Sequence, residues 1–275
     1  MPFKVLTLTA EAEANDILGR QPGESLSEDR LSSARREELK RTDPVIWDAL
    51  YQQKSVTYGG AFFAKEGLHF YKVVNPDLLN RYIIVDPANS KKKNSDYTTI
   101  FVFGVGEDRN YYWLHMLRDR LALDERALAL VRLHRKYKPL TVGYEQYGMQ
   151  ADISYVHQVQ EKMNYRFAIL PLGQQGPHRT LSKQDRIRTL VPLFNGGQIW
   201  IPERQDFTQV DKKMVDLIPV FIESEYLKYP SVTHDDMLDA MARMTDPTMN
   251  LEYPVGQDQA PPESTSFGGR TWVSA

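Results

Sequence analysis

The chain has 275 residues, 41% of them hydrophobic and 25% charged, so it can bury one substantial core and still carry extended flanks. Its formal net charge of −2 excludes a generally basic nucleic-acid coat, and the absence of cysteine excludes disulfides, thiolate zinc sites and cysteine nucleophiles. No apolar run reaches the length of a membrane helix and the N-terminus lacks a signal-peptide pattern, so we expect no membrane contact and a cytoplasmic location.

Residues 1–76 differ in pattern from the rest and are predicted to form an N-terminal arm. The arm begins with a short strand-like segment over 3–9 and contains a charged helical stretch over 27–40. An Asp-Pro pair then predicts a short helix over 43–53, because proline is well tolerated in the first helical turn. This helix has one apolar side and needs a surface to pack on.

The pattern becomes regular after the arm, and residues 77–245 are predicted to form one α/β domain. Three apolar segments have connections too short for helices, which predicts antiparallel strands over 81–85, 98–105 and 111–117. Strands and helices alternate afterwards, with helices expected over 124–137, 151–163, 182–194 and 207–222, strands over 141–144, 167–170 and 198–201, and a last helix after Thr233. This order predicts a mixed sheet of five strands or slightly more, with helices on both faces.

Three smaller features complete the organisation. Pro219 should bend or end the helix over 207–222. Residues 246–275 are rich in proline and polar side chains and are predicted to form a flexible tail. No Gly-x-x-x-x-Gly-Lys-Ser/Thr loop occurs, so the chain carries no ATPase motif of its own.

Acidic residues end two of the predicted strands. Asp86 follows a β-branched run, and Glu145 ends the strand over 141–144. Taken alone, Asp86 is better explained as an Asp-Pro turn, whereas Glu145 is equally well a functional residue or a surface glutamate. Asp96, at the start of the second strand, is a further candidate that a turn would explain as well.

The last helix supplies the strongest acidic signal. Thr233 is a natural N-cap, and Asp235 and Asp236 are favoured by the positive helix end, but neither effect explains Asp239. Asp239 lies on the same side of the helix as Asp236, where two like charges cost stability unless a cation is near. The buried stripe of this helix is expected to be Met237, Met241 and Met244, which leaves Asp236, Asp239 and Arg243 on a neighbouring polar stripe.

We therefore predict that Asp86, Glu145, Asp236 and Asp239 gather around hard divalent cations, which prefer carboxylate oxygens. Two Mg²⁺ or Mn²⁺ ions about 4 Å apart would support phosphodiester hydrolysis without a covalent nucleophile. His234 is a secondary ligand candidate, and a solvated histidine explains it as well. Asp235 remains an alternative to Asp236, although the spacing to Asp239 favours the latter.

Basic residues in two segments are the candidates for contacts with DNA phosphates. The segment over 178–188 is a loop that runs into a helix, and its cations Arg179, Lys183 and Arg186 combine with helix-start amides into an anion site. A run of three lysines, Lys91, Lys92 and Lys93, lies close in sequence to Asp86, although a solvated turn is the safer reading. No element that would read bases is visible, so little sequence preference is expected.

The ordered motifs Val85-Asp-Pro-Ala, Gly143-Tyr-Glu and His234-Asp-Asp-Met-Leu-Asp-Ala resemble the nuclease domain of the large terminase subunit of tailed bacteriophages. The arm, with Asp16-Ile-Leu-Gly-Arg-Gln-Pro-Gly-Glu and Trp47-Asp-Ala-Leu-Tyr-Gln-Gln, resembles the segment after the ATPase domain of that subunit. The resemblance implies a ribonuclease H-like fold, with Asp86, Glu145 and Asp236 as the catalytic metal-binding triad and Asp239 completing the site.

The same resemblance implies an endonuclease that cuts concatemeric viral DNA during genome packaging in the host cytoplasm. Its partners would be double-stranded DNA, a terminase ATPase domain, the small terminase subunit and the portal. Two alternatives stay open at this point. One is a junction resolvase or transposase-like nuclease, which shares the fold and the use of carboxylate-bound metal ions. The other is a non-catalytic module that docks on DNA or on a motor component.

Overall fold

The computed structural model describes residues 7–42, 46–53, 62–88, 97–145, 150–173, 181–209 and 211–254. A mixed seven-stranded sheet lies at the centre, in the order β1-β7-β4-β3-β2-β5-β6. The strands of this sheet are β1 (His69–Tyr71), β2 (Asn80–Asp86), β3 (Thr98–Val105), β4 (Tyr111–Asp119), β5 (Thr141–Glu145), β6 (Leu170–Leu172) and β7 (Ile199–Pro202). A separate hairpin consists of β8 (Asp206–Thr208) and β9 (Met214–Asp216).

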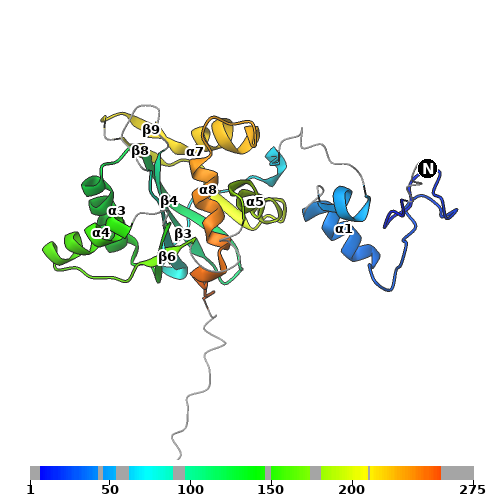
Figure 1. Cartoon of the computed structure of the whole chain (residues 1–275), viewed down its shortest axis with the longest axis horizontal. Helices are drawn as coiled ribbons and strands as arrows, with labels where there is room; N and C mark the ends of the chain where they lie inside the picture. The colour runs from blue at the N-terminus through cyan, green and yellow to red at the C-terminus, as the bar shows by residue number, and fades with distance from the viewer. Residues whose placement is uncertain are drawn as a thin grey trace, which may run out of the picture.

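Helices cover both faces of the sheet, as the alternation of elements predicted (Figure 1). Helices α3 (Leu123–Tyr137) and α4 (Gln150–Lys162) lie on one face. The other face carries α5 (Lys183–Arg188), α6 (Leu190–Asn195), α7 (Leu217–Val220) and α8 (Asp236–Ala242), with the π-helical turn η5 (Phe221–Glu225) and the 3₁₀ turns η6 (Tyr226–Lys228), η7 (Arg243–Thr245) and η8 (Pro247–Met249). No helix in the described part of the chain is long and apolar enough to cross a membrane.

The central strands are apolar on both faces because each face packs on helices. All eight residues of β3 are buried, and β2 is buried from Tyr82 to Val85. Alternate residues enter different cores, since successive side chains of a strand point to opposite faces. Ile83 and Val102 pack with α3, whereas Ile84 and Phe101 pack with α8.

The predicted antiparallel meander is confirmed, since β2 pairs with β3 and β3 pairs with β4 in opposite directions. β5 returns parallel to β2, with Val85 opposite Tyr144. The carboxyl ends of β2 and β5 therefore meet at the same edge of the sheet, which places Asp86 and Glu145 next to each other in neighbouring strands.

The helix expected over 207–222 is wrong in its first half. Residues 206–216 contain the hairpin β8-β9 instead, because Phe207 and Val215 pair across it and pack on the core. The helix begins only at Leu217, and Asp216 caps it by accepting a hydrogen bond from the Ile218 amide (3.1 Å). Pro219 therefore lies in a first turn, where amides have no partner within the helix, and the chain continues past it through Val220 into the π-helical turn η5.

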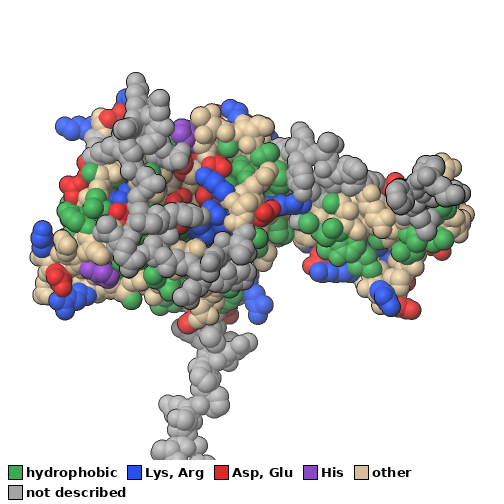
Figure 2. All heavy atoms as spheres, in the orientation of Figure 1, with side chains coloured by type: hydrophobic (Ala, Val, Ile, Leu, Met, Phe, Trp, Pro, Cys, Tyr) green, Lys and Arg blue, Asp and Glu red, His purple; other side chains and the backbone are tan. Residues whose placement is uncertain are grey.

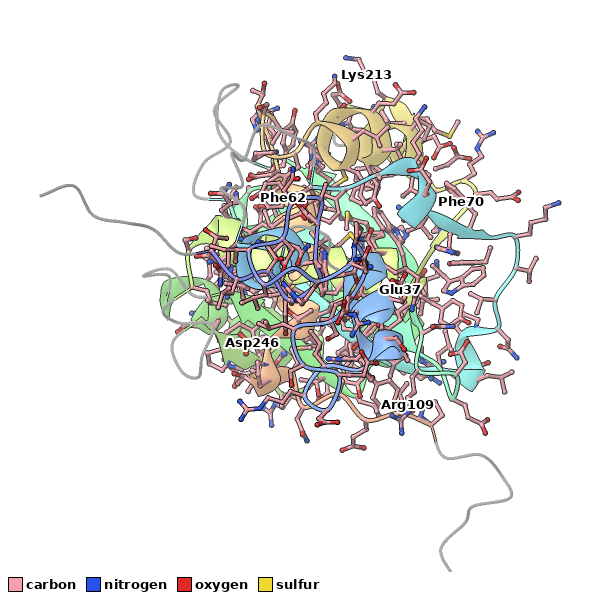
Figure 3. All side chains as sticks on the ribbon, turned by 90° about the vertical axis from the view of Figure 1, so that its right-hand side faces the viewer. Glu37, Phe62, Phe70, Arg109, Lys213 and Asp246 are labelled. Atoms are coloured by element: carbon pink, nitrogen blue, oxygen red, sulfur yellow. The ribbon has the colours of Figure 1, made fainter. Side chains whose placement is uncertain are left out.

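The first part of the predicted arm, over the described residues 7–42 and 46–53, is called the arm from here on; it contains α1 (Ser33–Thr42) and the π-helical turn η1 (Trp47–Tyr51) and extends away from the sheet (Figure 1). In Figure 3, which looks from the side of the arm, the helix that carries Glu37 lies in front of the sheet-containing part of the chain. α1 packs against α6, and Asn195 donates a hydrogen bond to the Thr42 carbonyl (3.1 Å). The strand expected over 3–9 falls partly outside the described residues, and residues 7–9 form no strand.

The other short elements are the 3₁₀ turns η2 (Lys65–Gly67) and η3 (Pro76–Leu78), which flank β1. The strand β1 was not predicted, because three residues are too few to show an alternating pattern. It pairs parallel to β7 and forms one edge of the sheet.

Candidate functional site

A row of polar side chains crosses the sheet at the carboxyl ends of β2 and β5. Asp86 of β2 lies opposite Thr99 of β3, and Thr99 lies opposite Arg118 of β4. Glu145 of β5 follows Tyr144, the parallel partner of Val85. Asp86 and Arg118 lie two positions after the core residues Ile84 and Met116, which pack on the α8 side, so their side chains point toward α8 as well. Glu145 directly follows Tyr144, which packs in the opposite core, and therefore also points to the α8 side.

Helix α8 brings two further carboxylates over this row. Asp236 and Asp239 are 3% and 4% exposed, and Glu145 is only 1% exposed. The predicted stripe of Met237, Met241 and Met244 is buried and anchors the helix to the core. Four acidic residues from three elements thus face one region between the sheet and α8.

Basic side chains accompany these carboxylates at close range. Arg186 of α5 donates to both oxygens of Asp239, with Nη2 at 2.8 Å from Oδ1 and 3.1 Å from Oδ2, and its Nη2 lies 3.7 Å from Glu145 Oε1. Arg243, fully buried, donates to Glu145 Oε1. Lys183 lies with its Nζ 2.6 Å from Asp235 Oδ1 and 3.4 Å from Asp239 Oδ2. Figure 2 shows acidic and basic side chains side by side near the middle of the face drawn.

The carboxylates act strongly on one another. Burial raises the pKa of Asp86 well above its usual range, and the negative charges of Glu145, Asp239 and Asp236 raise it further. Burial also raises the pKa of Asp239, although Arg186 opposes the shift. Burial alone would lower the pKa of Lys183, but its acidic neighbours raise it, so this ammonium stays charged. The site is a concentration of negative charge that nearby cations only partly balance.

The predicted site residues differ in where they lie. Asp86, Glu145, Asp236 and Asp239 come together, whereas Asp235 is partly exposed and pairs with Lys183. His234 has its Nδ1 3.8 Å from Asp236 Oδ2, and its ring meets Tyr97 edge-on with centroids 5.2 Å apart.

Asp96, Arg179, Lys91, Lys92 and Lys93 lie outside the described residues. Arg186 was expected on a surface that contacts DNA, but it is 4% exposed and bonded to Asp239. Arg186 therefore serves as a partner of the carboxylates rather than as a DNA contact. Among the described residues, Lys183, whose side chain is 43% exposed, remains a candidate for a phosphate contact.

One other prediction about the last helix is corrected by its geometry. Thr233 does not cap α8, since the N-cap position is Asp235 and no side chain at that position accepts a hydrogen bond from the helix. The amides of Met237 and Leu238 instead donate to Glu225 Oε2, both at 3.0 Å. Burial raises the pKa of Glu225 to about 8, against the opposing charge of Arg118.

Two residues at the site were missed by the sequence reasoning, Arg118 and Glu225. Arg118 donates to Asp236 Oδ2 (3.2 Å), and its Nε lies 3.5 Å from Glu225 Oε1. The period-two pattern of β4 places Arg118 on the α8 face, two positions after buried Met116, and this was the available signal. Nothing local marks Glu225, because its partners lie twelve or more residues away.

A second polar network fixes the backbone that follows Asp86. Arg126 of α3 pairs with Asp152 of α4, and its Nη1 donates to the Ala88 carbonyl (3.1 Å). Thr98 Oγ1 accepts a hydrogen bond from the Ala88 amide (3.1 Å). The chain therefore leaves β2 along a defined path, which holds Asp86 at the end of the row.

The carboxylate oxygens of the four acidic residues are the type of ligand that hard divalent cations prefer. No three Asp, Glu or His side chains in the described ranges form a group that could hold a metal ion as they stand, and Arg186, Arg243 and Lys183 lie within ion-pair distance of these carboxylates. However, Glu145 Oε2 is buried and has no hydrogen-bond partner among the described residues, an arrangement that costs free energy unless a ligand is bound. Carboxylates alone, without cysteine, favour Mg²⁺ or Mn²⁺ over zinc.

Comparison with known proteins gives a family and several structural likenesses. Residues 83–245 match the family model described as the terminase RNaseH-like domain. No curated protein matches the chain by sequence.

Among solved structures, the chain is similar to the magnesium-bound large terminase nuclease of thermophilic phage G20c, with 14% identity, TM-score 0.42, and 71% of this chain and 99% of that chain covered. It is also similar to the human cytomegalovirus terminase nuclease domain, Mn soaked and inhibitor bound, with 13% identity, TM-score 0.45, and 67% and 94% covered. A third is the yeast mitochondrial Holliday junction resolvase, with 15% identity, TM-score 0.37, and 63% and 77% covered.

The family model spans more than half of the chain, and it contains all four acidic residues of the site. The match agrees with the mixed sheet between two helical layers, so the predicted ribonuclease H-like fold is confirmed. The chain belongs to the terminase RNaseH-like domain family.

Proposed function

We propose that this chain is a divalent-metal-dependent endodeoxyribonuclease that cuts concatemeric viral DNA during genome packaging. The observation that carries the proposal is the convergence of Asp86, Glu145, Asp236 and Asp239, which act on one another through their charges. Like charges so close together in a buried place are unfavourable unless cations balance them. A cluster of this kind is suited to binding metal ions and the phosphodiester between them.

In this proposal each residue has a defined task. Asp86, Glu145, Asp236 and Asp239 would hold two Mg²⁺ or Mn²⁺ ions, with Asp235 and His234 as outer candidates. Bound ions of this kind supply a more acidic attacking water and stabilisation of the leaving 3′ oxygen. Lys183 keeps its positive charge beside the acids and is placed to contact a DNA phosphate. Arg186 and Arg243 fix the orientation of Asp239 and Glu145.

The partners follow from the family. The substrate would be double-stranded DNA, and the chain would act together with a terminase ATPase domain, the small terminase subunit and the portal. No ATPase motif occurs in the sequence, so the energy for DNA movement would come from another polypeptide or domain.

The test is digestion of supercoiled plasmid with Mn²⁺, Mg²⁺ or a chelator. We expect nicked and linear DNA with either metal and intact plasmid with the chelator. Asp86→Asn and Asp236→Asn should abolish cutting, because each removes a charged metal ligand without changing the volume of the side chain. Asp124→Asn is the matched control, since Asp124 is exposed at the start of α3 and should cut like the original chain.

Two outcomes would contradict the proposal. Cutting by the folded double variant of Asp86 and Asp236 would show that these carboxylates do not hold the metal. Absence of metal-dependent cutting by the unchanged chain would favour the docking module, in which Lys183, Arg186 and Arg243 simply neutralise the acids. Preference for branched over linear duplex in the same assay would favour a junction resolvase.

A further inference from the structure

The carboxylate of Glu225 replaces the missing side-chain cap of α8. Glu225 ends the π-helical turn η5 and is fully buried. Its Oε2 accepts hydrogen bonds from the Met237 and Leu238 amides, both at 3.0 Å. These amides belong to the first turn of α8, where backbone donors have no partner inside the helix. Glu225 therefore fixes the backbone that carries Asp236.

Arg118 connects Glu225 to Asp236. Its Nε lies 3.5 Å from Glu225 Oε1, and its Nη2 lies 3.2 Å from Asp236 Oδ2. The guanidinium also stacks on Tyr97, with its carbon 3.8 Å from the ring centroid, and the Arg118 side chain is 11% exposed. Arg118 thus has a fixed place between two acids, as expected for a planar fork of donors.

Arg118 also belongs to the polar row of the sheet. It lies opposite Thr99, which in turn lies opposite Asp86. The pairing of β2, β3 and β4 fixes the position of Arg118 relative to Asp86. Because Arg118 donates to Asp236, it also fixes the orientation of the Asp236 carboxylate relative to Asp86. Without Arg118, the buried Asp236 carboxylate would lose the guanidinium that links it to Glu225 and to the polar row of the sheet.

We propose that Glu225 and Arg118 are a positioning pair, which aims the Asp236 carboxylate at the metal site and thereby sets the affinity of that site for divalent cations. The inference rests on the proposed function, because the orientation of the Asp236 carboxylate can affect metal affinity only if Asp236 is a metal ligand. Hydrogen-bonding partners behind metal ligands affect metal affinity strongly, typically by about 10- to 100-fold. Neither residue needs to touch the metal or the DNA.

The direction in which the loss of Arg118 changes the affinity for divalent cations distinguishes a positioning role from a purely electrostatic one. Arg118 is a positive charge beside the acids, so its removal should strengthen cation binding if charge alone matters. Positioning predicts the opposite result, a weaker site. Arg120 is the matched control because its guanidinium lies on the same Tyr97 ring, 3.9 Å from the centroid, and it directly follows the same strand.

The experiment is calorimetric titration of the full chain with Mn²⁺, for the original protein and for Arg118→Gln, Arg120→Gln and Glu225→Gln. We expect Arg118→Gln to weaken Mn²⁺ binding by about 10- to 100-fold, and Arg120→Gln to leave it unchanged or tighter. Glu225→Gln keeps an acceptor oxygen for the Met237 and Leu238 amides, so we expect a smaller weakening. Thermal unfolding of the same samples shows whether each variant is folded.

Unchanged or tighter Mn²⁺ binding by folded Arg118→Gln would overturn the inference. If Arg118→Gln does not fold, Arg118→Lys decides instead, because lysine keeps the charge but lacks the fork that bridges two carboxylates. In that variant, weaker binding supports positioning and original affinity overturns it. Failure of the original chain to bind Mn²⁺ would be a different result, since it would overturn the proposed function and, with it, this inference.

Discussion

His115 makes the stability of the fold depend on pH through a single side chain. It lies on β4, and its ring stacks on Tyr137 of α3, with centroids 6.1 Å apart. Burial, together with the charge of Lys136, lowers the pKa of His115 to about 4. In the unfolded chain this pKa is about 6.5. At pH values between these two, the unfolded chain therefore binds a proton at His115, whereas the folded chain does not.

The contribution of His115 to the free energy of unfolding should therefore become increasingly unfavourable as the pH decreases from about 6.5 to about 4, and this penalty is absent at higher pH. Urea denaturation at pH 7.5 and pH 5 measures the difference. In His115→Gln, the loss of stability between these pH values should be smaller than in the original chain. His157→Gln, at an exposed position of α4, serves as control. An equal pH dependence in His115→Gln and His157→Gln would contradict the assignment.

The residues of the site were predictable to different degrees. Asp86 and Glu145 end apolar strands, so the sequence indicates both their chemical type and their place at a sheet edge. The roles of Arg118 and Glu225 were not predictable, because they arise from contacts between segments far apart in the chain. Arg118 and Asp236, for example, are separated by 118 positions.

At the level of elements, strand β4 depends on a side chain from outside the sheet. β4 contains a bulge, since Val102 pairs with His115 while the next residue, Phe103, pairs with Trp113. The Gln205 side chain then bonds β4, with Oε1 accepting from the Met116 amide (2.8 Å) and Nε2 donating to the Met116 carbonyl (2.6 Å). Gln205 Oε1 also accepts from Trp113 Nε1 (2.6 Å). One amide group thus takes the place of a neighbouring strand.

Gln205→Ala should lower the free energy of unfolding by on the order of 3 kcal/mol, because it leaves buried donors and an acceptor of β4 without partners. Urea titration followed by tryptophan fluorescence measures this change. Glu203→Ala, an exposed position on the same segment, should have almost no effect. If both variants unfold at the same urea concentration, Gln205 does not stabilise the bulge.

Helices and strands were predictable from the sequence where their hydrophobic pattern extends over enough residues to be recognised. The strands β2, β3 and β4 and the helix α3 occur within two residues of their predicted bounds, because seven or more residues repeat one pattern in each. The hairpin β8-β9 was read as part of a helix since each of its strands has three residues. Such short strands are decided by pairing and burial rather than by local pattern.

At the level of the whole molecule, the arm and the sheet-containing part have largely separate interactions (Figure 1). In the described part of the arm, the ion pairs join arm residues to one another, for example Glu11 to Arg36 and Lys40. The core of the other part already includes Phe62 and Phe63. The arm also exposes large apolar side chains, namely Ile17, Leu18, Leu26 and Leu50.

A chain that begins at residue 62 should therefore fold on its own. The deletion removes the packing of α1 on α6 and the hydrogen bond from Asn195 to Thr42, which contributes about 1 kcal/mol. Loss of this hydrogen bond alone lowers the unfolding temperature by roughly 2–4 °C in a domain of this length, and the lost packing of α1 adds to that shift. Circular dichroism during heating measures it, and metal-dependent plasmid cutting by the shortened chain shows whether the site is intact. A broad, non-cooperative transition would instead show that the arm is part of the folding unit, because the core around Phe62 and Phe63 could not then form without it.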